Sequence, residues 1–443
     1  MLADDQVLSL AEQTLREVEA DQADVMVWQE NLSLTRFAES FIHQNVQEEN
    51  IRFTIRAVVN KQSGCATTNR TDPAGLRAAA QSASRAARHS APNPEFRSLA
   101  APKAITPADG FVQATADSTP EARADAVAQI IREATAIGAV ASGSLSTSFG
   151  NFAVANSLGI RTVEPWTRGK LVTVIADSSA GDASGYAEWR GKDISEMDPL
   201  QAGQIAAQKC AASRGQQTIP PGQYIVVLEE PAVADLLDFL AYLGLGATSY
   251  QEGRSFMCGQ LGKKIVTESI SLWDDGHDPR QLPMAFDYEG VPKQKVMLIQ
   301  NGIAQGVVYD SYTAGKEGKE STGHALPATS TFGPFPMNLC LAPGTATKEE
   351  MIDSTERGIF ITRFHYTNVI SPRETIITGM TRDGTFLIEN GKITRPIYKL
   401  RFTENIIEAL KRVEMLGREV KLSGEYTESL VPALKIDAFT FTS

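Results

Sequence analysis

Apolar residues follow two different periods in the first half of the chain. Over Asp4–Ala20, and after Asp72, Thr119 and Asp198, they recur every three to four residues, which is typical of an amphipathic helix. Asp72, Thr119 and Asp198 each directly precede a proline. Their side-chain oxygens can therefore cap helices that have proline at the first position. Between the helices, segments such as Ile51–Arg56 alternate apolar and polar residues, as half-buried strands do. The first half therefore predicts a mixture of helices and strands.

The second half is richer in strand signals. It begins with the apolar strand Tyr224–Leu228, and a helix with leucines and valine on one face follows. Thr347 and Glu350 form a capping box that predicts a second helix, and the apolar spacing over Thr403–Leu416 predicts a third. The remaining segments indicate short strands with turns at Asp275-Gly276, Asn301-Gly302, Asp383-Gly384 and Asn390-Gly391.

A break in composition separates the two halves. The segment Gly215–Gly222 contains two adjacent prolines and is typical of a linker. A chain of 443 residues is long enough for two domains with separate cores. We therefore expect an α+β protein, with an N-terminal mixed α/β domain at residues 1–215 and a strand-rich C-terminal domain at residues 222–443.

Composition and net charge argue against some classes of binding partner. The formal net charge is −11, and an acidic surface repels phosphate, so we expect no nucleic-acid partner. No apolar run is long enough to span a bilayer, and the first residues lack the basic and apolar segments of a signal peptide, so we expect no membrane partner. The four cysteines lie far apart and form no CxxC pair, which favours a cytoplasmic protein with reduced thiols.

Five segments, distributed over nearly the whole chain, carry a family resemblance. They are Val154–Gly159 (VANSLG), Pro221–Leu228 (PGQYIVVL), Phe286–Pro292 (FDYEGVP), Ser321–Ala325 (STGHA) and Met380–Ile393 (MTRDGTFLIENGKI). Their order and spacing resemble the TldD/PmbA family, which is related to metallopeptidases. The resemblance implies a two-domain α+β fold and a dimer. In the paired bacterial system of this family, TldD holds zinc by two histidines and a cysteine, and its partner TldE (PmbA) lacks them. Together the two subunits digest unfolded peptides.

The residues that the resemblance places at the metal site lack the metal-binding side chains. Aligned on Ser255–Gly262 (SFMCGQLG), the His-Glu-x-x-x-His motif of the peptidase members falls on Asp238, Phe239 and Leu243. The metal cysteine would fall near Ser423–Leu430, where there is none. Leucine has no lone pair for zinc, and phenylalanine cannot accept a proton from a metal-bound water. We therefore expect no metal, no other cofactor and no catalysis by this chain alone.

Other side chains are candidates to line what remains of the cleft. Asp287, Glu289, His324 and His365 all belong to the C-terminal half. No two of the five histidines lie within a helical turn of each other, so we favour hydrogen-bonding or packing roles over a zinc site assembled from loops. Asp238 is expected either to point to solvent or to line the cleft, on a helix that is otherwise mostly core.

Two functions agree with this sequence. The first is a metal-free, TldE-like subunit that pairs with a TldD-like zinc peptidase and acts on unfolded peptides, in proteolysis or peptide maturation. The alternative is a stand-alone homodimer that binds peptides or a small molecule without hydrolysing them. The sequence leaves the substrate and the choice between heterodimer and homodimer open.

Overall fold

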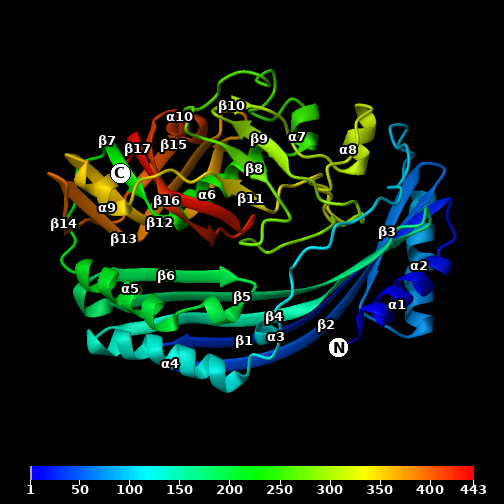
Figure 1. Ribbon diagram of the computed structural model, residues 1–443, viewed down its shortest axis with the longest axis horizontal. Coiled ribbons are helices and arrows are strands. Elements are labelled where there is room, and N and C mark those ends of the chain that lie inside the picture. Colours follow the sequence, from blue (N-terminus) through cyan, green and yellow to red (C-terminus); the bar gives the residue numbers. More distant parts are fainter. Residues whose placement is uncertain (1) are drawn as a thin grey trace.

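The computed structural model describes residues 2–443 and contains two β-sheets (Figure 1). The first is a six-stranded antiparallel sheet with the order β3-β2-β1-β4-β5-β6. Its strands are β1 (Gln22–Ala38), β2 (Phe41–Val59), β3 (Gln62–Thr68), β4 (Val140–Asn156), β5 (Arg161–Asp177) and β6 (Ala183–Gly191). The short turn between Asn156 and Arg161 joins β4 to β5.

Helices cover one face of this sheet. They are α1 (Asp4–Arg16), α2 (Pro73–His89), α4 (Pro120–Ala136) and α5 (Pro199–Ala212), with the single turn α3 (Gln113–Ala116) beside them. The predicted caps form, because Asp72, Thr119 and Asp198 each accept a backbone N–H three residues on. Two apolar clusters fill this interface, with α1 and α2 at one end of the sheet and α4 and α5 at the other.

The opposite face of the same sheet packs on the C-terminal lobe. Phe152 of β4 stacks on Phe286 with ring centroids 5.0 Å apart, in a cluster that also contains Trp166 and Val291. The six-stranded sheet is therefore a middle layer, with helices below and the C-terminal lobe above in Figure 1.

The second sheet has eleven strands and a mixed pattern. Five of them form a closed ring of pairings, in the order β7-β12-β13-β15-β17 and back to β7. Helix α6 (Glu230–Leu240) packs against β12 and β17, and the largest apolar core of the chain surrounds it.

The remaining elements belong to this lobe. The strands are β7 (Gly222–Leu228), β8 (Leu272–Asp274), β9 (Val296–Gln300), β10 (Ile303–Ala304), β11 (Leu339–Leu341), β12 (Arg357–Ser371), β13 (Ile376–Glu389), β14 (Lys392–Pro396), β15 (Arg401–Asn405), β16 (Val413–Ser423) and β17 (Ser429–Phe441). The helices are α7 (Ala247–Gln251), α8 (Ser311–Lys316), α9 (Lys348–Asp353) and α10 (Ile406–Lys411). The 3₁₀ turns η1 (Ser178–Ala180) and η2 (Ile194–Glu196) lie in the N-terminal half, before and after β6.

Two local predictions were wrong. The helix expected over Thr403–Leu416 is reduced to α10, because the flanking residues pair instead as β15 and β16, and such pairing overrides a local helical period. The Asp383-Gly384 dipeptide makes a bulge inside β13 rather than a hairpin turn, with φ of 55° and 122°. Asn390-Gly391 does join β13 to β14.

The change from one sheet to the other occurs between α5 and β7, around the proline-containing segment. That residues 1–215 and 222–443 fold as separate domains stays a prediction. No helix within residues 2–443 is both long and apolar enough to cross a membrane.

Candidate functional site around Asp238 and the 424–428 loop

Helix α6 continues into a π-helical turn, η3 (Ala241–Leu245). In a regular α-helix, side chains five residues apart point about 140° away from each other. A π-turn winds more slowly and so brings such a pair closer to one face. Asp238 and Leu243 have this spacing, which is the spacing of the two histidines in the family motif. The π-turn therefore brings the two positions at which the family resemblance places the histidines closer to one face.

Asp238 is buried and binds the loop that connects β16 to β17. One carboxylate oxygen accepts the backbone N–H groups of Glu425 (2.8 Å) and Tyr426 (3.2 Å). The other accepts the N–H of Thr427 (2.9 Å) and its hydroxyl (2.5 Å). We expected Asp238 either to point to solvent or to line the cleft. It does border the cleft, but its carboxylate oxygens bind residues 424–428. We call these residues the 424–428 loop.

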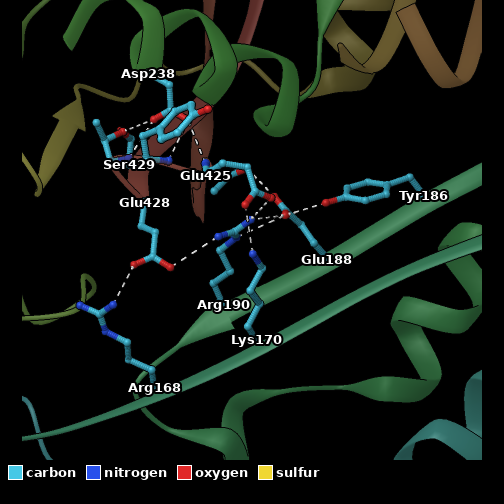
Figure 2. Close-up of polar contacts among 12 residues, drawn as sticks. Arg168, Lys170, Tyr186, Glu188, Arg190, Asp238, Glu425, Glu428 and Ser429 are labelled. Carbon is cyan, nitrogen blue, oxygen red and sulfur yellow. Dashed lines mark hydrogen bonds and ion pairs between the residues drawn. The ribbon is translucent and has the colours of Figure 1, made fainter. Parts of the chain in front are cut away.

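The opposite side of the 424–428 loop is held by the N-terminal sheet, as Figure 2 shows. Arg190 of β6 has a side chain that is 2% exposed, and it pairs with Glu425 (3.0 Å), Glu428 (3.4 Å) and Glu188 (3.3 Å). Lys170 of β5 adds a 3.2 Å contact to Glu425. The loop therefore bridges the two lobes, bound to α6 on one side and to strands β5 and β6 on the other.

The charges at this junction shift several pKa values. Burial raises the pKa of Asp238, although its four hydrogen bonds oppose the shift. Burial also raises the pKa of Asp235, one turn earlier on α6, to about 7, with the nearby charge of Asp238 adding to it. Burial opposes ionisation of Glu425, yet Arg190 and Lys170 hold its pKa below the usual value. Glu425 therefore stays anionic, whereas Asp235 changes its charge near neutral pH.

A wide groove of about 860 Å³ opens beside Asp238. Its lining is mostly aromatic and aliphatic: Phe239, Tyr242, Leu326, Phe332, Phe335, Met337, Val369, Ile370, Pro372 and Tyr426, together with Asp238, Thr367 and Asn368. Tyr242 stacks on Phe332 at 5.3 Å, and Phe332 meets Phe335 edge-on at 5.4 Å. Tyr242, Ile370 and Tyr426 are more than half exposed. An exposed apolar surface of this kind is typical of a binding site.

One wall of the groove is a strand with a free edge. β12 contributes Thr367–Ile370 to the wall and pairs with β13 on one side. On its other side it pairs with β7 only over Gly358–Ile361. Within residues 2–443, the backbone of β12 beyond that point therefore has no strand partner on this side. Such an edge can pair with an extended chain.

Of the four residues suggested for the cleft, Asp287, Glu289 and His324 are buried in the core instead. His324 is fully enclosed, with Nε2 2.8 Å from Asp274 and Nδ1 2.9 Å from the Thr322 hydroxyl. Asp287 accepts backbone N–H groups from Glu289, Val291 and Ala325, which fixes a turn. None of the three lines the groove.

Glu289 has a structural partner in the N-terminal sheet. It pairs with Arg56 at 3.2 Å and caps the N–H of Ser311 at 3.0 Å, so it joins the two lobes. His365 lines a different cavity of about 460 Å³, where burial and the neighbouring Arg382 lower its pKa. The four residues are therefore not brought together, and sequence reasoning missed the pairs Arg190–Glu425 and Asp238–Thr427. No sequence signal connects these pairs, because each joins distant segments.

Zinc, which the family implies, does not fit these side chains. Both oxygens of Asp238 are occupied by N–H and hydroxyl donors, and Phe239 and Leu243 offer no lone pair. Across residues 2–443, no group of three or more His, Cys, Asp or Glu side chains is arranged to hold a metal ion.

Comparison with known proteins fits this architecture. The sequence model of the PmbA/TldA metallopeptidase C-terminal domain matches residues 221–443, and that of PmbA/TldA metallopeptidase domain 1 matches residues 34–87. The chain belongs to this family. It is the TldD/PmbA family that the sequence motifs resemble.

Relatives and solved structures extend this result. Metalloprotease TldD homolog of Buchnera aphidicola is 28% identical over 45% of this chain and 42% of its own length. Metalloprotease PmbA of Escherichia coli O157:H7 is 24% identical over 66% of this chain and 64% of its own. The chain spans about half the length of the curated relatives it matches. The crystal structure of TldE from Thermococcus kodakarensis superposes with a TM-score of 0.90 at 20% identity, over 99% of this chain and 100% of that one. The α+β fold with a strand-rich C-terminal lobe is therefore that of the TldE structure.

Proposed function

We propose that this chain is a TldE-like, metal-free subunit that binds unfolded peptides and assembles with a TldD-like zinc peptidase. The observation that carries the proposal is the role of the Asp238 side chain. Asp238 stands where the family alignment places a zinc histidine, and it holds the 424–428 loop in place. The apolar groove beside it is open.

The groove supports a peptide as the bound molecule. Its aromatic and aliphatic lining offers area to side chains of any sequence, and the edge of β12 offers backbone hydrogen bonds that do not depend on sequence. A folded protein cannot place an extended segment along this edge without unfolding locally. The site therefore favours unfolded chains.

A subunit of this kind contributes binding and not bond cleavage. Phe239 occupies the position of the family's general base, and a phenyl ring neither accepts nor donates the proton that hydrolysis requires. In the proposed assembly, the zinc subunit hydrolyses the peptide, and this chain holds peptide and completes the enclosed space.

Peptide binding by the isolated chain tests the first part. We expect a fluorescein-labelled unstructured peptide to bind, and Phe332→Ser to weaken binding about tenfold by removing a groove aromatic. Phe41→Ser is the control, because Phe41 is also an exposed phenylalanine but lies on β2, outside the groove. Equal affinities for parent and both variants would contradict the groove assignment.

Cleavage assays test the assembly. The isolated chain should leave the peptide intact, and a mixture with a TldD-like protein from the same cell should cleave it and co-elute in size-exclusion chromatography. A chain that elutes as a dimer alone, binds peptide and ignores the TldD-like protein would instead support the homodimeric binding protein. Turnover by the isolated chain that survives chelation and repurification would refute the non-catalytic role.

A further inference from the structure

A second, smaller cavity lies behind the 424–428 loop, between the two lobes. Its volume is about 40 Å³, and its lining includes Glu164, Trp166 and Arg168 of β5 together with Gln281. Tyr426 and Met337 line both this cavity and the groove, so the cavity lies directly beside the groove.

This cavity contains a buried donor and a buried acceptor without partners. Trp166 is 7% exposed, and its indole N–H donates to no group within residues 2–443. Gln281 is 1% exposed, and its Oε1 accepts from none. The Nε2 of Gln281 donates to the carbonyl of Leu339 at 2.7 Å, which fixes the orientation of the amide and leaves Oε1 as the free end. Buried polar atoms are almost always satisfied, so two unsatisfied atoms in one cavity indicate a ligand.

A carboxyl group adds further acceptor capacity. Both oxygens of Glu164 share the single backbone N–H of Ala285, at 2.9 and 3.3 Å. No basic side chain among residues 2–443 lies within ion-pairing distance of it. Burial raises the pKa of Glu164 to about 7, against the opposing effect of the Ala285 N–H. Arg168 also lines the cavity, but its guanidinium lies over the Trp166 ring, 5.5 Å from the ring centroid, and pairs with Glu428 at 3.8 Å. The unpartnered atoms are therefore one N–H donor, from Trp166, and one acceptor, from Gln281, and the Glu164 carboxyl beside them has free lone pairs.

We propose that this cavity binds a primary carboxamide, carried by a glutamine or asparagine side chain of a peptide in the groove. The amide oxygen accepts from the indole N–H of Trp166, and the two amide hydrogens donate to Gln281 Oε1 and Glu164. A cavity of about 40 Å³ holds roughly two or three water-sized atoms, which matches the three heavy atoms of a carboxamide. The peptide part of this inference rests on the proposed function.

Competing groups match the cavity less well. A carboxylate would place its oxygens against the acceptors of Gln281 and Glu164, and an ammonium would leave the Trp166 donor unpaired. A methyl or thioether group would leave the Trp166 N–H and the Oε1 of Gln281 without good partners. Sites built to hydrogen-bond a polar group discriminate strongly against analogues that lack it.

The indole N–H of Trp166 is a direct reporter. The chain has four tryptophans, so protein labelled with ¹⁵N-tryptophan gives four indole signals, and Trp166→Phe identifies the one that reports on the cavity. We expect propionamide to move this signal and propionate, its isosteric carboxylate, to leave it unchanged. A Trp166 signal that neither probe moves, or that both move equally, would overturn the proposal in favour of bound water.

Peptide affinities complete the test. Between two free-acid peptides that differ by glutamine or methionine at one position, the glutamine peptide should bind about tenfold more tightly, and Trp166→Phe should abolish this preference. Trp273→Phe is the matched control, because the Trp273 indole N–H is also buried and unpartnered but does not line the cavity. Equal binding of both peptides would sink the carboxamide site and leave the groove proposal intact. A propionamide response without any peptide binding would do the reverse.

Discussion

The Asp238→Asn substitution separates two opposing effects at the junction. In the parent, Asp238 accepts four hydrogen bonds, two at each carboxylate oxygen. An amide keeps the size and shape of the carboxylate but replaces one oxygen with an NH₂ group. In one orientation the NH₂ group faces the backbone N–H groups of Glu425 and Tyr426. In the other it faces the N–H of Thr427, whereas the Thr427 hydroxyl can turn and accept from it. The substitution also removes the free-energy cost of burying a charge. In the parent, this cost appears as the raised pKa of Asp238.

We expect the free-energy cost of the lost hydrogen bonds to exceed the gain from removing the buried charge. Each buried donor left without an acceptor costs about 1–3 kcal/mol, and one or two backbone N–H donors are affected, depending on the orientation of the amide. Part of this cost is recovered because Tyr426 is 71% exposed, so water can reach the loop once it shifts. We therefore expect the loop to lose about 2–4 kcal/mol of local stability.

Hydrogen exchange of the loop amides measures this effect. The amides of Glu425, Tyr426 and Thr427 should exchange roughly 30- to 1,000-fold faster in Asp238→Asn than in the parent, because local opening requires less free energy. Asp125→Asn on the exposed face of α4 is the control and should leave the rates unchanged. Loop amides that exchange as slowly in Asp238→Asn as in the parent would refute the anchoring role, and slower exchange would show that charge burial dominates.

Three further predictions concern the same junction. Arg190→Met should destabilise the chain by about 3–5 kcal/mol in urea unfolding, because it leaves the buried Glu188 carboxylate without its cation; a loss below about 1 kcal/mol would contradict this. Burial raises the pKa of Asp235 from 3.8 to about 7, so the folded state binds this proton more tightly and the parent loses stability as pH rises through that window. The free energy of unfolding of Asp235→Asn should therefore rise relative to that of the parent between about pH 4 and pH 7, by at most about 4 kcal/mol. A difference that does not depend on pH would disprove the raised pKa of Asp235. Restoring the motif by Asp238→His, Phe239→Glu and Leu243→His together should lower the melting temperature and give weak zinc binding at most, since the third ligand is still missing. A variant that melts like the parent and gains stability in zinc would show a preorganised site.

Local sequence signals predicted the parts of the fold that depend on local chemistry. The proline-preceded caps at Asp72, Thr119 and Asp198 form as expected, since a cap requires only an oxygen and three following residues. The helix over Thr403–Leu416 failed because its apolar residues satisfy strand pairing as well as helical packing. Periodicity alone cannot choose between these states when a partner strand lies far away in sequence.

The family membership was contained in the sequence, and so was the chemistry of Asp238, Phe239 and Leu243, because the identity of a side chain needs no coordinates. What the Asp238 side chain binds was decided only by the tertiary structure. Asp238 meets the 424–428 loop nearly 190 residues later, and Arg190 reaches the same loop from the other lobe. Contacts between such distant segments depend on how the two sheets stack and on which pairings the closed ring of β7, β12, β13, β15 and β17 permits. A linear pattern of apolar and polar residues records that a side chain will be buried, but not which distant groups will surround it.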